Sequence, residues 1–185
     1  MRVLIIPEDP TNDQYVLKPI IAAIFADLGR KARVNVLQNP RLRSVNQALD
    51  PKTIEAIIVS YPQENLFLLL LDRDCEETRI ENIKMREKNA LSVNRRLLGG
   101  LAIEEIEMWA LAVYEGTLPH PWQEMRRECH PKEEYFEPLI AQLELNYDVG
   151  RGRKHLMRSL PSNYSRLLQL CPEVSELRAR IKQML

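Results

Sequence analysis

The apolar run at residues 66–71, which reads LFLLLL, constrains the fold of this chain more than any other feature. It contains five leucines and one phenylalanine, and it stops abruptly at Asp72-Arg73-Asp74. Six residues are too few for an independent helix, and a short continuous apolar run between polar segments is typical of a strand that is buried on both faces. We therefore expect residues 66–71 to form a central strand of a parallel sheet.

Strand-like and helical segments alternate along the first part of the chain. Short apolar or alternating runs predict further strands at residues 2–6, 31–38 and 95–103. Helical patterns predict helices at residues 12–28, 43–63 (in two pieces around Asp50-Pro51) and 104–114, and we expect a polar helix at residues 76–91. This alternation predicts an α/β fold with a mostly parallel central sheet flanked by helices. We expect residues 1–114 to form this core and residues 115–185 to form a helical C-terminal extension packed on it, within a single domain.

The composition limits the classes of partner. The 26 basic and 26 acidic residues give a formal net charge of zero, so binding to nucleic acid would need a local basic patch. No apolar run approaches the roughly 18 residues that a membrane span needs, and the first ten residues do not resemble a signal peptide. The three widely separated cysteines, Cys75, Cys129 and Cys171, favour a reducing compartment over a disulfide framework. We expect a cytoplasmic protein that does not bind membranes; its oligomeric state is not predictable.

Acidic residues follow three of the four predicted strands: Glu8 and Asp9, then Asp72 and Asp74, and finally Glu104, Glu105 and Glu107. Ligands of parallel sheets bind at the carboxyl ends of the strands, so these carboxylates are expected to converge. If the backbone stays extended past residue 71, Asp72 and Asp74 point to the same side and face one Mg²⁺ ion, which prefers oxygen ligands. Structural roles are the alternative: Asp74 and Glu77 match a capping box, and acids in a first helical turn favour the helix dipole.

A basic segment at residues 150–158 is the best candidate for binding phosphate. On a helix, Arg151, Lys154, His155 and Arg158 would share one face. Positive residues at the start of a helix oppose its dipole, and a bound phosphate would compensate for them. A solvated basic face is the alternative. Cys129-His130 lacks the second ligand pair that a zinc site needs.

The arrangement of a Glu after the first strand and a DxD after a later one resembles the TOPRIM domain, the metal-binding unit of topoisomerases, bacterial primases and OLD-family nucleases. Here these residues are Glu8 and Asp72-Arg73-Asp74. The chain resembles more closely a group of small bacterial TOPRIM-like proteins over almost its whole length. Glu8-Asp9-Pro10-Thr11, Glu107-Met108-Trp109 and Cys171-Pro172 occur in the order found in that group. Asp9 stands where the group usually has glycine.

The resemblance implies Mg²⁺-dependent (or Mn²⁺-dependent) phosphodiester chemistry on nucleic acid, as in a nuclease. It implies that Glu8 transfers protons, that Asp72 and Asp74 bind the metal with Glu8 beside them, and that Glu107 is a further ligand or orienting group. Independently of the resemblance, extended geometry at Asp72-Arg73-Asp74 would leave Arg73 turned away from the ion or reaching for a phosphate. DNA processing or phage defence is the implied setting, with a separate ATPase partner because the chain has no Walker motif.

Two other functions stay open. One is a non-catalytic interaction subunit of such a system. The other is a receiver-like phosphoacceptor module, since acids after the first strand and an Asp after the third would also suit a phosphorylated aspartate.

Overall fold

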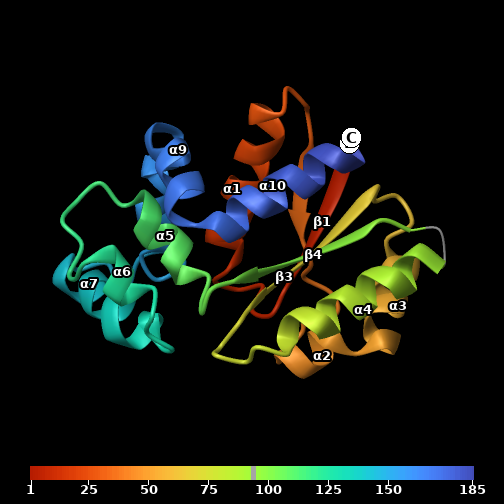
Figure 1. The fold of residues 1–185 in the computed structure, drawn as a ribbon, viewed down its shortest axis with the longest axis horizontal. Coiled ribbons are helices and arrows are strands. Elements are labelled where there is room, and N and C mark those ends of the chain that lie inside the picture. Colours follow the sequence, from red (N-terminus) through yellow and green to blue (C-terminus); the bar gives the residue numbers. More distant parts are fainter. Residues whose placement is uncertain (93–94) are drawn as a thin grey trace.

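The computed structural model describes residues 1–92 and 95–185, and within them it forms one parallel sheet of four strands. The strands are β1 (Arg2–Pro7), β2 (Arg33–Val36), β3 (Leu66–Asp72) and β4 (Leu97–Ala102). Their order in the sheet is β2-β1-β3-β4, and every neighbouring pair is parallel. The predicted α/β fold with a central parallel sheet is confirmed (Figure 1).

The leucine-rich run forms β3 because both faces of this strand are covered. Leu66, Leu68 and Leu70 belong to one hydrophobic cluster, and Phe67, Leu69 and Leu71 belong to a second cluster on the opposite face. All six side chains are fully buried. A continuous apolar run is therefore the sequence that this position requires.

Helices form a layer on each face of the sheet. The second cluster includes residues of α2 (Val45–Leu49), α3 (Pro51–Ser60) and α4 (Arg79–Ser92). The first cluster includes residues of α1 (Gln14–Asp27) and α10 (Pro172–Met184), which lie on the other face in Figure 1. The predicted break in the helix at residues 43–63 is confirmed, because the Asp50 side chain accepts a hydrogen bond from the Thr53 amide (2.8 Å) and caps α3.

The remaining helices gather at the end of the sheet where β4 leads into α5 (Figure 1). They are α5 (Glu107–Val113), α6 (Trp122–Met125), a π-helical turn (Lys132–Phe136), α7 (Glu137–Gln142), α8 (Arg153–Leu156), a 3₁₀ turn (Met157–Ser159) and α9 (Leu160–Leu170). Buried side chains from this region join the cluster that contains Leu66 and Leu68. The C-terminal region is therefore helical, as predicted, and its buried side chains contribute to this cluster.

The cysteines differ from the expectation. Cys75 and Cys129 form a disulfide, and Cys171 is free and buried. The expectation of unpaired cysteines is wrong because residues 54 positions apart are brought together by the fold, which spacing alone does not reveal. No helix in residues 1–92 and 95–185 is long and apolar enough to cross a membrane.

Candidate functional site

The carboxylates predicted at the strand ends do converge, because β1, β3 and β4 are parallel and end at the same edge of the sheet. A cavity of about 240 Å³ lies there. Its acidic lining consists of Glu8, Asp9, Asp13, Asp72, Asp74, Glu105 and Glu107. Asn12, Lys132, Arg151 and Arg153 complete the lining. Glu8, Asp72, Asp74 and Glu107, the four residues singled out for catalysis, thus lie around one cavity.

Asp72 is the last residue of β3 and lies partly buried at this edge. Its Oδ1 accepts a hydrogen bond from the Ile106 amide (2.7 Å), which fixes the carboxylate against the chain that follows β4. Burial raises the pKa of Asp72 well above its ordinary value, and the charges of Glu107, Asp13 and Asp74 raise it further. Asp72 therefore holds a proton readily unless a cation offsets the surrounding negative charge.

Asp74 reaches the cavity by a different route from the one predicted. The backbone turns after Asp72, and Asp74 and Cys75 have φ angles of 46° and 52°, so the extended geometry does not continue. Arg79 Nη1 donates to Asp74 Oδ2 (2.5 Å) and to the backbone oxygen of Asp72 (2.5 Å). The capping-box alternative is also wrong, because α4 begins at Arg79. An arginine therefore holds the turn that carries both aspartates.

Glu8 has a carboxylate oxygen that is both buried and unpaired. Its Oε2 has no hydrogen-bond partner among the residues that the structure describes. Burial and then the charge of Asp74 raise the pKa of Glu8, although Arg79 and the Val45 amide act against this shift. A buried carboxylate oxygen without a partner costs free energy, so this atom is suited to receive a proton or a cation.

Asp9 supports the turn between β1 and α1. Its carboxylate accepts hydrogen bonds from the Thr11 amide (2.8 Å) and from Asn12 Nδ2 (3.0 Å). Burial acts to raise the pKa of Asp9, but these bonds outweigh it and the pKa is lowered. Asp9 is not among the residues with positive φ, so the backbone does not require glycine at this position.

Glu107 is engaged by an arginine that the sequence did not single out. Glu107 and Arg153 are each 3% exposed and form an ion pair, and the Arg153 guanidinium lies over the Phe136 ring at 4.9 Å from its centroid. This pair crosses from α5 to α8 and holds the two short helices together at the cavity. The Glu107 carboxylate is thus fixed by Arg153 at the cavity.

Asp13 and Lys132 also line the cavity, although the sequence did not point to them, and so does Glu105, which the sequence placed among the converging acids. Asp13 is 6% exposed, and burial together with the charge of Glu107 raises its pKa to about 8. Burial raises the pKa of Glu105 to about 7, against the hydrogen bond that its Oε2 accepts from the Lys132 amide (2.6 Å). Asp13 immediately precedes α1, where a capping role would have explained it. Lys132 has no sequence signal.

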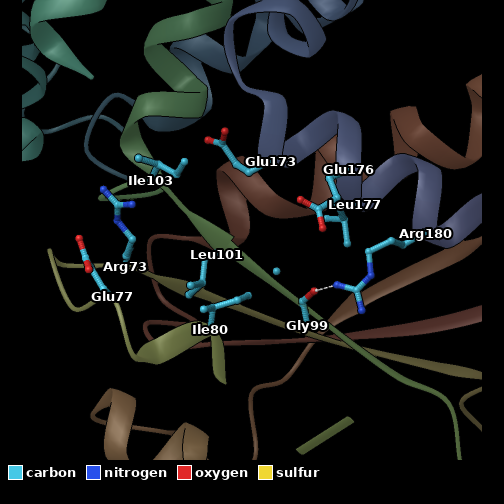
Figure 2. A pocket seen from close by; sticks show the side chains of 11 residues that line it. Arg73, Glu77, Ile80, Gly99, Leu101, Ile103, Glu173, Glu176, Leu177 and Arg180 are labelled. Carbon is cyan, nitrogen blue, oxygen red and sulfur yellow. Dashed lines mark hydrogen bonds between the residues drawn. The ribbon is translucent and has the colours of Figure 1, made fainter. Parts of the chain in front are cut away.

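The predicted phosphate-binding residues separate into two groups. Arg151 lines the cavity, whereas Lys154, His155 and Arg158 are exposed and lie outside its lining. The prediction that these four residues share one helical face is wrong, because α8 has only four residues and Arg151 precedes it with a φ of 48°. Arg73 turns away from the cavity, pairs with Glu104 and lines a groove on another side of β4 (Figure 2).

Arginines flank the acidic cavity on two sides. Glu8 and Asp9 also line a hollow of about 510 Å³ together with Arg41 and Arg43. Arg151 and Arg153 also line a hollow of about 440 Å³, with Tyr147 as another lining residue. Each of these two hollows shares two lining residues with the acidic cavity, so arginine-lined surface adjoins the carboxylates at both places.

No three His, Cys, Asp or Glu side chains in the described parts of the chain are already placed to hold a metal ion. Arg79 engages Asp74 and Arg153 engages Glu107, so two of the carboxylates point at guanidinium groups. The donor set of oxygens nevertheless suits Mg²⁺, which commonly takes only one or two protein carboxylates and keeps several waters. Asp72 and the unpaired Glu8 Oε2 are the oxygens best fitted to this role.

The observed fold is a four-stranded parallel α/β sheet, an arrangement that is compatible with Rossmann-like and TOPRIM-like folds. Strand order alone does not choose between them. Comparison of the chain with protein-family models, with curated protein sequences and with solved structures finds no match to any of them.

Proposed function

We propose that this chain is a TOPRIM-like protein that performs Mg²⁺-dependent phosphodiester chemistry on nucleic acid. One observation carries the proposal: carboxylates with raised pKa values meet around a cavity, and arginine-lined hollows adjoin that cavity on two sides. Such crowding of like charges is costly in a folded protein unless protons or a cation offset it. Perturbed carboxylates in a cleft are typical of functional sites.

The chain's own residues divide between holding a cation and handling protons. Asp72 would hold Mg²⁺ or Mn²⁺, with Glu8 and Asp74 as neighbouring ligands; Asp74 is paired with Arg79 in this structure. When bound, the ion supplies electrostatic stabilisation of phosphoryl oxygens. Glu8, whose pKa is raised by burial and by the charge of Asp74, is suited to take up and return a proton.

The arginines at both ends of the carboxylate cluster are suited to bind a polyanion. Arg41 and Arg43 lie on one side, and Arg151 lies on the other. Because the formal net charge is zero, binding of nucleic acid would depend on such local groups and would weaken with salt. DNA processing or phage defence with a separate ATPase partner is the setting that the motif resemblance favours.

The proposal is tested by metal binding and cleavage measured on the same variants. We expect the wild type to bind Mn²⁺ and to cleave DNA or RNA with Mg²⁺ present, Asp72→Asn to lose both, and Glu8→Gln to lose cleavage while retaining most of the binding. Glu55→Gln, which changes an exposed carboxylate on α3, is the control and should leave both unchanged. Equal Mn²⁺ binding by the wild type and Asp72→Asn would refute the metal site. Binding without cleavage would favour a non-catalytic interaction subunit.

A phosphoacceptor module is the second candidate, and Lys132 is the observation that favours it. Asp72 ends the third strand, acids follow the first strand, and a lysine lines the same cavity. A lysine beside a phosphorylated aspartate can pair with the phosphoryl oxygens. Incubation with acetyl phosphate and intact-mass measurement separates the two candidates, because one added phosphoryl group that Asp72→Asn abolishes would support the module.

A further inference from the structure

A second groove, separate from the acidic cavity, follows the free edge of β4 (Figure 2). Its volume is about 380 Å³. Ile80 of α4 and Leu177 of α10 approach it from opposite sides of the sheet, and Gly99, Gly100 and Leu101 of β4 lie between them. This groove is distinct from the site proposed above, since the two linings share no residue.

At this edge of β4, the outward backbone groups of Gly99 have hydrogen-bond partners, whereas those of Leu101 do not within the described part of the chain. Residues 98, 100 and 102 face β3 in the ladder, so residues 97, 99 and 101 direct their amide and carbonyl groups outward. The Gly99 amide donates to Glu87 Oε1 (2.6 Å), and the Gly99 carbonyl accepts from Arg180 Nη1 (2.8 Å). The Leu101 amide and carbonyl have no such partner among the residues that the structure describes.

The charges around the groove do not balance. Three charged residues of the lining form ion pairs: Arg73 with Glu104, Glu173 with Arg126, and Arg180 with Glu87. Glu77 and Glu176, by contrast, are exposed at the groove and have no ion-pair partner in the described residues. The mouth of the groove therefore carries two glutamates that form no ion pair with the described residues, beside an apolar interior.

We propose that this groove binds an extended segment of a partner protein, which adds to β4 as a short strand. The Leu101 amide and carbonyl would exchange hydrogen bonds with one residue of that segment, as in other cases of strand addition. An apolar side chain of the segment would lie between Ile80 and Leu177. Lysine or arginine residues flanking it would pair with Glu77 and Glu176, and the Glu87–Arg180 pair limits the segment to a few residues at the Leu101 end.

The test uses a phage-displayed library of random octapeptides, selected on the full chain. We expect the recovered peptides to carry an apolar residue flanked by lysine or arginine. Their affinity, measured by fluorescence anisotropy, should fall about tenfold or more in the double variant Glu77→Lys/Glu176→Lys, since reversal of two charges replaces attraction by repulsion. The matched control Glu55→Lys/Glu144→Lys changes two exposed glutamates elsewhere and should bind as the wild type does.

The backbone contact is tested on the peptide, so that folding of the protein is not affected. Methylation of one peptide nitrogen after another should abolish binding at the one position that donates to the Leu101 carbonyl. Leu101→Pro, which removes an outward amide of an edge strand, should also weaken binding. Recovery of no peptide, absence of a basic preference, or binding that survives charge reversal would overturn the proposal. A dimer that Leu101→Pro dissociates would instead assign the groove to a second copy of this chain.

Discussion

Replacement of Asp13 by asparagine should remove part of the pH dependence of stability in metal-free protein. Burial and the charge of Glu107 raise the pKa of Asp13 from 3.8 to about 8, so the folded state binds a proton that the unfolded state releases at lower pH. The free energy of unfolding therefore falls as the pH rises from about 4 to 8. One pKa unit corresponds to about 1.4 kcal/mol, so the shift sets an upper limit of about 6 kcal/mol for this residue.

The Asp13→Asn variant removes the charge and keeps the local hydrogen bond. Its Oδ2 accepts a hydrogen bond from the Asp9 amide (3.1 Å), and an asparagine oxygen retains this bond while the charge is removed. Urea unfolding in EDTA at pH 5, 6, 7 and 8 should show a decline of several kcal/mol for the wild type. The decline should be smaller for Asp13→Asn but should not vanish, because the raised pKa values of Asp72 and Glu105 still contribute to it. Glu55→Gln is the control and should follow the wild type. A wild-type stability that is constant or rises over this range would refute the reasoning.

Three further predictions concern stability. Arg153→Met leaves the buried Glu107 unpaired and should lower the free energy of unfolding by about 3–5 kcal/mol. In urea unfolding, Arg153→Met/Glu107→Gln should recover part of this loss. A double variant as unstable as Arg153→Met would contradict this prediction. Reduction of the Cys75–Cys129 disulfide, whose cysteines are 54 residues apart, should lower the free energy of unfolding by about 4 kcal/mol, because the unfolded chain gains loop entropy. Thermal unfolding with and without dithiothreitol tests this prediction. The stability of Cys129→Ser, which cannot form the disulfide, should not respond to dithiothreitol. A Cβ on Gly99 would clash with Ile83 Cγ2, so Gly99→Ala should lower the free energy of unfolding by about 1–3 kcal/mol. Ile83→Val removes only the Cδ1 methyl and should not relieve the clash, whereas Ile83→Ala removes Cγ2 and should relieve it.

The sheet and the convergence of acids were predictable because both follow from simple periodic rules. A strand covered on both faces needs a continuous apolar run, and residues 66–71 meet that need. The ends of parallel strands meet at one edge, so placing Glu8 and Asp72 after strands was sufficient to place them near each other. Neither inference needed knowledge of side-chain packing.

The details of the cavity were not predictable because they depend on contacts between distant segments. Arg153 comes from a four-residue helix and reaches Glu107, 46 positions away. Arg73 and Asp74 are directed by a turn with positive φ angles, which alternation along a strand does not anticipate. The disulfide between Cys75 and Cys129 likewise depends on how the C-terminal region packs beside that turn.

The central claim is that a divalent cation binds among the carboxylates at the ends of β1 and β3. Anomalous diffraction from crystals grown with Mn²⁺ tests this claim most directly, because it locates the ion without reference to activity. The account predicts an anomalous peak within coordination distance of the Asp72 carboxylate and of Glu8 or Asp74, and its absence in Asp72→Asn crystals. Mn²⁺ found only elsewhere on the molecule, with the Asp74–Arg79 pair intact, would contradict it.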